Sequence, residues 1–270
     1  MSELLLEVDD LYVEFSTRDG VARAVNGVSF TVERGQTVAI LGESGSGKSV
    51  TAQAVMGILD TPPARIAGGS IRLQGTELIG LPEDEYRQIR GRQIAMIFQD
   101  ALSALNPVSS VGDQISEMFR IHQGLGRKES RAAAIEVMKR VKIPGAEERV
   151  GDYPHQFSGG MRQRIMIAMM IALKPLVLIA DEPTTALDVT VQSQIMDLLQ
   201  ELKEETNMGL ILITHDLGVV AEVADRVVVM NSLKKHLMKY LLLLIRTTLE
   251  LLRRQKWLYL SSNYSAEERD

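Results

Sequence analysis

The residues with the clearest chemistry form a glycine-rich segment, GESGSGKS, at positions 42–49. Glycine lets backbone N–H groups turn toward a polyphosphate where a side chain would block them, and lysine adds a positive charge. The last serine offers a hydroxyl to Mg²⁺, and a helix that starts there directs the positive end of its dipole at the phosphates. The segment consists of Gly42, Glu43, Ser44, Gly45, Ser46, Gly47, Lys48 and Ser49. Because it lies between a predicted strand and a predicted helix, a phosphate-binding loop is favoured over a glycine-rich turn without a ligand.

Two adjacent carboxylates end another predicted strand, in the segment LVLIADEP at 176–183. Ligands of parallel sheets bind beyond the carboxyl ends of the strands. Neighbouring side chains on a strand point to opposite sides, so we assign Asp181 to the Mg²⁺ shell and Glu182 to orienting and polarising an attacking water. The alternative, two solvated acids, is common for an isolated Asp-Glu pair and less favoured beside a phosphate loop.

Two further polar residues follow predicted strands of the same sheet. Gln99 follows the strand at 94–98, where its amide could reach the metal or the water, although alone it would be a surface glutamine. His215 follows the segment LILIT, where its imidazole could donate a hydrogen bond to the γ-phosphate. A lone histidine is usually structural, and His122, His155 and His236 are left unassigned because they lack such a setting.

The elements that must position these residues can be read from the hydrophobic pattern. Alternating apolar segments at 4–33 predict antiparallel strands, which Ser70–Leu78 is expected to extend. Val38–Leu41 predicts a buried strand before the loop, and Ser49–Leu59 predicts a helix after it. Further buried strands are predicted at Ile94–Phe98, Leu176–Ala180, Leu210–Thr214 and Arg226–Met230. Helical patterns separate them, so the expected fold class is α/β, a P-loop domain with a mainly parallel core sheet and an N-terminal antiparallel β subdomain.

The pattern changes between about 101 and 172, where helices are predicted, including Lys128–Lys142 and Gly160–Leu173, and no good strand is found. This stretch predicts an inserted helical subdomain. A Pro/Gly-rich break is expected around Thr61–Gly69.

Composition excludes several function classes. The net charge of −5 provides no basic field, so nucleic acid is not expected as the main partner. The absence of cysteine excludes disulfides, cysteine-ligated zinc and iron–sulfur clusters. The longest apolar run, Ile165–Leu173, is far shorter than the roughly 20 residues that span a bilayer, and the acidic N-terminus lacks an export signal. We expect a chain that is neither exported nor integral to the membrane.

Taken in order, these residues resemble the ATP-binding subunits of ABC transporters. After the loop come Gln99, FSGGMRQR at 157–164, LVLIADEP at 176–183, TALD at 185–188 and ITHD at 213–216. The resemblance covers residues 4–230 and implies an ABC-type ATPase that uses ATP and Mg²⁺, with Glu182, His215 and Gln99 as catalytic residues and Ser49, Gln99 and Asp181 near the metal.

The FSGGMRQR signature predicts a second, incomplete phosphate site. Ser158 can cap a helix that starts near Gly160, which leaves Gly159 and Gly160 as exposed donors without a lysine of their own. In the family two subunits pair head to tail, so each ATP lies between one chain's phosphate loop and the other chain's Ser158, Gly159, Gly160 and Met161. The resemblance places Asp188 where the two sites communicate. Met161 replaces a commoner glutamine.

Two assignments are more specific. The resemblance places Phe15 where the family stacks an aromatic ring on adenine, with a core phenylalanine as the alternative.

The segments IFQDALSALNPV and YPHQFSGGMRQR resemble the branch that imports dipeptides or oligopeptides and, in some members, nickel. This branch implies a second ATPase subunit, identical or related, integral membrane permease subunits and, indirectly, an external solute-binding protein. It also implies a peripheral position on the cytoplasmic face of the cell membrane, with Ala101–Val111 as a candidate contact with the permease.

The tail at 231–270 departs from the family. As written, Leu237–Leu252 predicts a leucine-rich helix with basic flanks, which would bind a membrane surface or a partner, or pack on the domain. Codon degeneracy also permits Met238–Leu252, read one nucleotide out of register, to become EIFAAPHQDYTRAL, which is close to the family's own tail. We therefore hypothesise a frameshift just after Met230, which resequencing of the locus would test.

Three functions are weighed. A transport ATPase would couple ATP-driven dimer closure to a change in its membrane partners. A soluble ABC ATPase in DNA repair or translation would use the same clamp mechanically, but such proteins usually carry a long coiled-coil insertion or two ATPase halves. The third possibility is a subunit that is inactive because of its altered tail.

Overall fold

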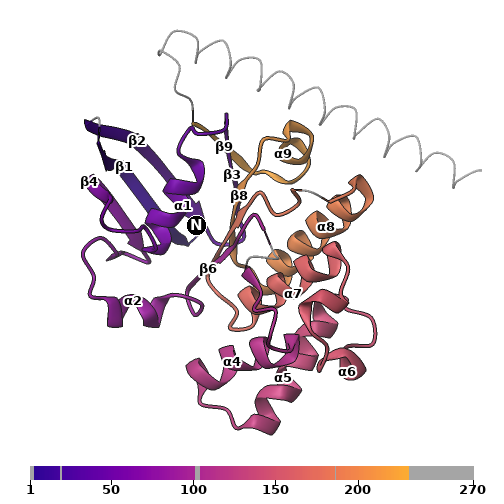
Figure 1. The fold of residues 1–270 in the computed structure, drawn as a ribbon. Helices are drawn as coiled ribbons and strands as arrows, with labels where there is room; N and C mark the ends of the chain where they lie inside the picture. Colours follow the sequence, from indigo (N-terminus) through magenta and orange to yellow (C-terminus); the bar gives the residue numbers. More distant parts are fainter. Residues whose placement is uncertain (1–2, 19, 101–103, 186, 231–270) are drawn as a thin grey trace, which may run out of the picture.

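The computed structural model describes residues 3–18, 20–100, 104–185 and 187–230, which form two sheets and the helices that cover them (Figure 1). The expectations for residues 231–270 and for the first part of Ala101–Val111 lie outside these ranges. No helix among the described residues is long and apolar enough to cross a membrane.

The N-terminal sheet is antiparallel, with the strand order β2-β1-β4-β5. Its strands are β1 (Leu4–Thr17), β2 (Gly20–Glu33), β4 (Ala64–Leu73) and β5 (Thr76–Glu77). The predicted extension of this sheet is confirmed, but its predicted bounds are wrong. Strand β4 begins at Ala64, inside the stretch expected as a Pro/Gly-rich break, because pairing with β1 from Ala64 to Leu73 holds the segment extended despite its glycines.

The second sheet is parallel and has the strand order β6-β7-β8-β3-β9. Its strands are β3 (Thr37–Gly42), β6 (Ile94–Ile97), β7 (Val177–Asp181), β8 (Gly209–Ile213) and β9 (Arg226–Met230). The five predicted buried strands are therefore confirmed to within about one residue at each end. All five run in the same direction, so their carboxyl ends lie at one edge of the sheet.

Alternate residues of the parallel strands enter two different cores. In β7, Val177 and Ile179 pack in the core shared with α1 and the antiparallel sheet, whereas Leu178 and Ala180 pack in the core formed with the helices of the opposite face. Strands β6 and β8 divide in the same way. Burial on both faces explains why these strands read as continuous apolar runs rather than alternating ones.

Helix α1 (Lys48–Met56) lies between the two sheets and contacts β1, β2, β3, β6 and β7 (Figure 1). It starts one residue earlier than predicted and ends at Met56 rather than Leu59, because Gly57 adopts the left-handed conformation that ends the helix. The short helix α2 (Glu83–Ile89) follows β5 and leads into β6.

The described residues between 104 and 176 form helices and no strand. These are α4 (Val111–Gln123), α5 (Arg127–Arg140), α6 (Ala146–Arg149), the single 3₁₀ turn η1 (Pro154–Gln156) and α7 (Gly159–Ile171). In Figure 1 they gather at the end of the molecule away from the antiparallel sheet. Helices α8 (Val189–Thr206) and α9 (Leu217–Val223) complete the cover of the parallel sheet.

Candidate nucleotide-binding site

The glycine-rich loop joins the end of β3 to the start of α1, as its sequence predicted. Two of its glycines leave no room for a side chain. A Cβ on Gly47, whose φ is +91°, would overlap the carbonyl oxygen of Ala24, and a Cβ on Gly42 would overlap the carbonyl oxygen of Met230. Ser46 Oγ is buried without a hydrogen-bond partner. The strands around the loop therefore leave room only for glycine at these two positions, as a phosphate-binding turn requires.

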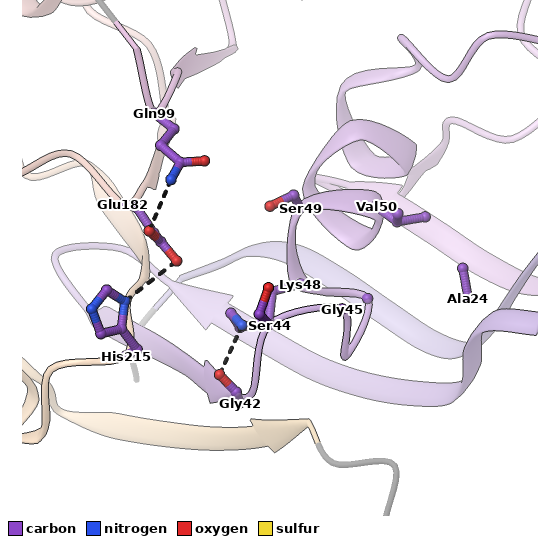
Figure 2. A pocket seen from close by; sticks show the side chains of 11 residues that line it. Ala24, Gly42, Ser44, Gly45, Lys48, Ser49, Val50, Gln99, Glu182 and His215 are labelled. Atoms are coloured by element: carbon purple, nitrogen blue, oxygen red, sulfur yellow. Dashed lines mark hydrogen bonds and ion pairs between the residues drawn. The ribbon is translucent and has the colours of Figure 1, made fainter. Parts of the chain in front are cut away.

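Lys48 is held within the loop. Lys48 is only 6% exposed, and its Nζ donates a hydrogen bond to the carbonyl oxygen of Gly42 at 2.8 Å (Figure 2). Nζ also donates to the carbonyl oxygen of Glu43 at 2.8 Å. These carbonyls satisfy the ammonium group without neutralising it. Its positive charge therefore remains available to an anionic ligand in the same space.

Asp181 is the last residue of β7, and its side chain lies toward Ser49, which donates a hydrogen bond to it. Burial raises the pKa of the Asp181 carboxyl above its usual range, and the hydrogen bond from Ser49 acts in the opposite direction. Asp181 is buried, with only 6% of the residue exposed, so it has few water contacts. It is therefore placed to accept a cation with little competition from solvent.

Glu182 lies just past the strand and has a left-handed backbone, with φ +46°. Its amide donates to the carbonyl oxygen of Ile213 in β8 at 2.9 Å, which holds this strained conformation. Strand β7 ends at Asp181, so the alternation expected for two neighbours on one strand does not describe this pair. That the two carboxylates point to opposite sides stays a prediction.

Three side chains contact the Glu182 carboxylate. Gln99 Nε2 donates to Oε2 at 3.1 Å (Figure 2). Thr185 Oγ1 donates to the same oxygen at 3.0 Å. His215 Nδ1 lies 3.4 Å from Oε1. The structure thus brings together Gln99, Glu182 and His215 from the ends of β6, β7 and β8, as the sequence predicted.

These residues face the phosphate loop across one open pocket of about 520 Å³, a volume typical of small-molecule sites. Its lining comprises Ala24, Gly42, Ser44, Gly45, Gly47, Lys48, Ser49, Val50, Gln99, Glu182 and His215. Charged and polar side chains lie at one end, and Ala24 and Val50 lie at the other (Figure 2). The pocket therefore offers an anion-binding end and an apolar end.

Three residues that contribute to the site were not predicted from the sequence. Ala24 and Val50 carry no chemical signal, because a small apolar residue is common anywhere. Thr185 belongs to the TALD segment, but its bond to Glu182 depends on the turn after β7.

Several predicted site residues do not line this pocket. Phe15 is partly buried against the core, between Ala22 of β2 and Ala64 of β4, so the core alternative describes its packing in this structure. The others are Glu43, Ser46, Asp181, Ser158, Gly159, Gly160, Met161 and Asp188. Glu43, Ser46 and Asp181 adjoin lining residues, whereas the rest belong to the signature and to the start of α8.

The signature forms the capped start of α7. Ser158 Oγ accepts a hydrogen bond from the Met161 amide at 3.4 Å, which confirms the predicted cap. Gly160 lies against Val191, where a Cβ would come within 2.6 Å of a side-chain methyl group. Asp188 caps α8 by accepting from the Val191 amide at 3.0 Å. The signature and Asp188 therefore share one packed surface outside the pocket.

The donor set fits Mg²⁺ bound together with a nucleotide. Ser49, Asp181 and Gln99 offer a hydroxyl, a carboxylate and an amide oxygen, the hard oxygen ligands that Mg²⁺ prefers. Among the described residues, no group of three or more His, Cys, Asp or Glu could hold a metal ion by itself. This agrees with a cation that takes its remaining ligands from phosphates and water.

A parallel sheet, a glycine-rich loop entering a helix, and polar residues at three neighbouring strand ends define a P-loop nucleotide-binding domain. The signature on α7 narrows the class to ATP-binding cassettes. The sequence model of the ABC transporter family matches residues 25–185, and the chain belongs to this family as its ATPase domain.

Curated relatives in bacteria are similar over most of this chain. The oligopeptide transport ATP-binding protein OppD of Haemophilus influenzae is 53% identical over 228 residues, which are 84% of this chain and 70% of that protein. OppD of Bacillus subtilis is 50% identical over 84% of this chain and 64% of that protein. The dipeptide transport ATP-binding protein DppD of Bacillus subtilis is 52% identical over 85% of this chain and 69% of that protein. The chain thus spans about two thirds of the length of these relatives.

Solved structures share the fold. A dimeric ATP-binding cassette in a post-hydrolysis state with ADP and phosphate has a TM-score of 0.74 and 26% identity, over 84% of this chain and 94% of that one. The cbiO1 protein of Clostridium perfringens, part of the cbiONQ ABC transporter complex, has a TM-score of 0.70 and 28% identity, over 95% of this chain and 99% of that one.

Proposed function

We propose that this chain hydrolyses ATP to drive an ABC importer for dipeptides or oligopeptides. The observation that carries the proposal is the position of Glu182, in contact with Gln99 and His215 and across the pocket from Lys48. A carboxylate at the edge of a phosphate site can orient and polarise a water molecule for attack on the γ-phosphorus.

Each side chain has one task in this reaction. The loop amides and Lys48 bind the β- and γ-phosphate oxygens, and Glu182 accepts a hydrogen bond from the attacking water. The new bond joins the water oxygen to the γ-phosphorus, and the bond from that phosphorus to the bridging oxygen of ADP breaks. The proton that the water loses passes by way of Glu182 to solvent. Gln99 and His215, both in contact with Glu182, respond to the γ-phosphate and hold the carboxylate in place.

Mg²⁺, when bound with ATP, would neutralise charge on the phosphate oxygens, and Ser49, Asp181 and Gln99 would hold it. At the opposite, apolar end of the pocket, Ala24 and Val50 suit the uncharged part of the nucleotide. Phe15 is proposed to stack on adenine after a change of its side-chain position.

The site is proposed to be completed by a second ATPase subunit. The pocket lining contains nothing from the signature, although the start of α7 offers the amides of Gly159, Gly160 and Met161 beside Ser158. A head-to-tail partner, identical or related, would bring its signature to the γ-phosphate of this chain. Asp188 packs beside the signature and would link the two sites.

The proposal of peptide import rests on the relatives, whose names concern oligopeptide and dipeptide transport. These names favour transport over a mechanical role in translation or DNA repair. We propose that the chain works at the cytoplasmic face of the membrane, bound to two permease subunits that an external solute-binding protein supplies with peptide. Nickel is the alternative cargo.

The experiment that tests hydrolysis compares the full chain with its Glu182→Gln variant. We expect the variant to bind Mg·ATP, to accumulate as an ATP-bound dimer and to lose at least about a hundredfold in turnover, since an amide oxygen is far less basic than the carboxylate that polarises the water. Glu201→Gln is the matched control, because Glu201 is a surface glutamate paired with Lys142. Turnover by Glu182→Gln that equals the wild-type rate would remove Glu182 from this role.

Transport is tested separately by co-expression with permease genes, which are first sought next to the gene for this chain. We expect a stable complex whose ATPase activity rises with a peptide-loaded binding protein. Exclusive association with ribosomes or DNA would refute the importer while leaving ATP hydrolysis intact.

A further inference from the structure

The last turn of α1, the helix that begins with Lys48, needs hydrogen-bond donors from elsewhere. The final carbonyl groups of a helix have no partners within it. Here the amides of Gly57 and Ile58, just past the helix, turn back to two earlier carbonyls. The carbonyl oxygens of Val55, Met56 and Gly57 point beyond the helix end.

Helix α2 and the residue after it supply one donor to each of these three carbonyls. Tyr86 Oη donates to Val55 O at 3.0 Å. Arg90 Nε donates to Met56 O at 2.9 Å, and Arg90 Nη2 donates to Gly57 O at 2.7 Å. A guanidinium group at a helix C-terminus also interacts favourably with the helix dipole.

This contact has little freedom to shift. The Tyr86 ring covers Gly57 so closely that a Cβ there would lie 2.5 Å from Tyr86 Cζ. The Arg90 guanidinium lies 4.7 Å from the centroid of the same ring and is bound on its other side by both oxygens of Glu83, at 2.7 and 3.1 Å. Burial raises the pKa of Tyr86 to about 12, so its hydroxyl remains a donor at neutral pH.

Arg90 also begins the turn that leads to Gln99. It forms a β-bridge with Ile94, the first residue of β6, and the amide of Gly91 donates to Ile94 O at 2.8 Å. Strand β6 then runs to Ile97, two residues before Gln99. One residue therefore contacts the end of the phosphate-binding helix through its side chain and the start of the Gln99 strand through its backbone.

We propose that Arg90 is a positioning residue for ATP hydrolysis. By fastening the last turn of α1 to the start of β6, it fixes Lys48 and Ser49 relative to Gln99 across the pocket. The inference rests on the proposed function, because it assumes that Gln99 and the loop act on the same phosphate. The competing explanation is that Arg90 only stabilises the fold.

The test compares Arg90→Ala, Arg90→Lys and Arg87→Ala in the full chain. Arg87 is the matched control, because it lies on the same helix and pairs with the same Glu83, but its side chain is 73% exposed. We expect Arg90→Ala to lower kcat about tenfold with less than a threefold change in KM, since misplacement by about 1 Å can reduce rates up to a hundredfold. Arg90→Lys should recover little, because lysine cannot donate to both carbonyls through a planar fork. Arg87→Ala should match the wild-type chain.

A double-mutant cycle separates positioning from stability. With Gln99→Ala already present, Arg90→Ala should lower kcat less than about twofold, because coupled residues are not additive. All turnover is measured well below the thermal midpoint of each variant. An equal loss in both backgrounds, or a lower thermal midpoint with unchanged kcat, would overturn the proposal.

Hydrogen exchange provides a readout that does not need turnover, so it distinguishes a failure of this inference from a failure of the proposed function. We expect Arg90→Ala to increase exchange both at 48–51 and at 94–99, and Arg87→Ala to increase neither. An increase confined to α2 would refute the link between the two segments.

Discussion

At the scale of single residues, the candidate site depends on backbone conformations that ordinary residues rarely adopt. Glu182 has φ +46° and is held by the hydrogen bond that its amide donates to the carbonyl oxygen of Ile213. Gly47 has φ +91° and lies against the carbonyl of Ala24. Both residues line the pocket. Strain of this kind persists where the surrounding structure determines the conformation.

The first prediction follows from Gly47. Gly47→Ala adds a methyl group that overlaps Ala24 O, so we expect a loss of at least about 2 kcal/mol in the free energy of unfolding and loss of nucleotide binding. Gly45→Ala is the control, because Gly45 also has a positive φ, +78°, but faces open space. It should lose only about 1 kcal/mol. Denaturant unfolding measures both variants, and equal losses would show that the contact with Ala24 is unimportant.

At the scale of elements, two helices begin with a serine cap, but the two serines differ in exposure. Ser158 caps α7, and Ser110 caps α4 by accepting from the Asp113 amide at 3.2 Å. Ser158 is exposed on the signature, whereas Ser110 is buried. The cap of α7 therefore lies at a proposed interface, whereas the cap of α4 only stabilises the fold.

Substitution of each serine by alanine distinguishes the two roles. Ser158→Ala and Ser110→Ala should each lose about 1 kcal/mol of folding stability, since each removes one helix cap. Only Ser158→Ala should weaken ATP-dependent dimerisation of the Glu182→Gln chain, by about tenfold, the value of one hydrogen bond to a charged phosphate. Analytical ultracentrifugation with Mg·ATP measures the dimer. Equal dimerisation in both variants would contradict a partner ATP at the signature.

At the scale of the whole molecule, β9 connects the C-terminal part of the described chain to the phosphate loop. It pairs with β3 from Val38 to Gly42, and the buried Met230 packs on Thr51 of α1. The hypothesised frameshift falls directly after this residue and stays a prediction.

We therefore predict different outcomes for two truncations. A chain ending at Met230 should bind Mg·ATP as the full chain does, because every proposed nucleotide residue and β9 remain. A chain ending at Asp225 should lose at least about 3 kcal/mol of stability, since burial of Met230 alone contributes that order of free energy. Thermal unfolding and nucleotide titration measure both. Weak binding by the longer truncation would show that the tail supports the site.

Part of the fold and part of the candidate site could be predicted from the sequence alone. The glycine-rich loop, the acidic pair, Gln99 and His215 each lie at the end of a continuous apolar run, and strands buried on both faces produce such runs. Parallel strands place their carboxyl ends at one edge, so the convergence of these residues followed from their order. The cap at Ser158 followed from local spacing.

The contacts between segments far apart in the sequence could be seen only in the folded chain. The steric limits at Gly47 and Gly42 come from Ala24 and Met230, and the bond from Thr185 to Glu182 depends on a left-handed turn. Strand β4 begins within a Pro/Gly-rich stretch because β1 pairs with it. Hydrophobic periodicity records which residues are buried but not which neighbour buries them, so the partial burial of Phe15 and the contact of Arg90 with α1 required the folded chain.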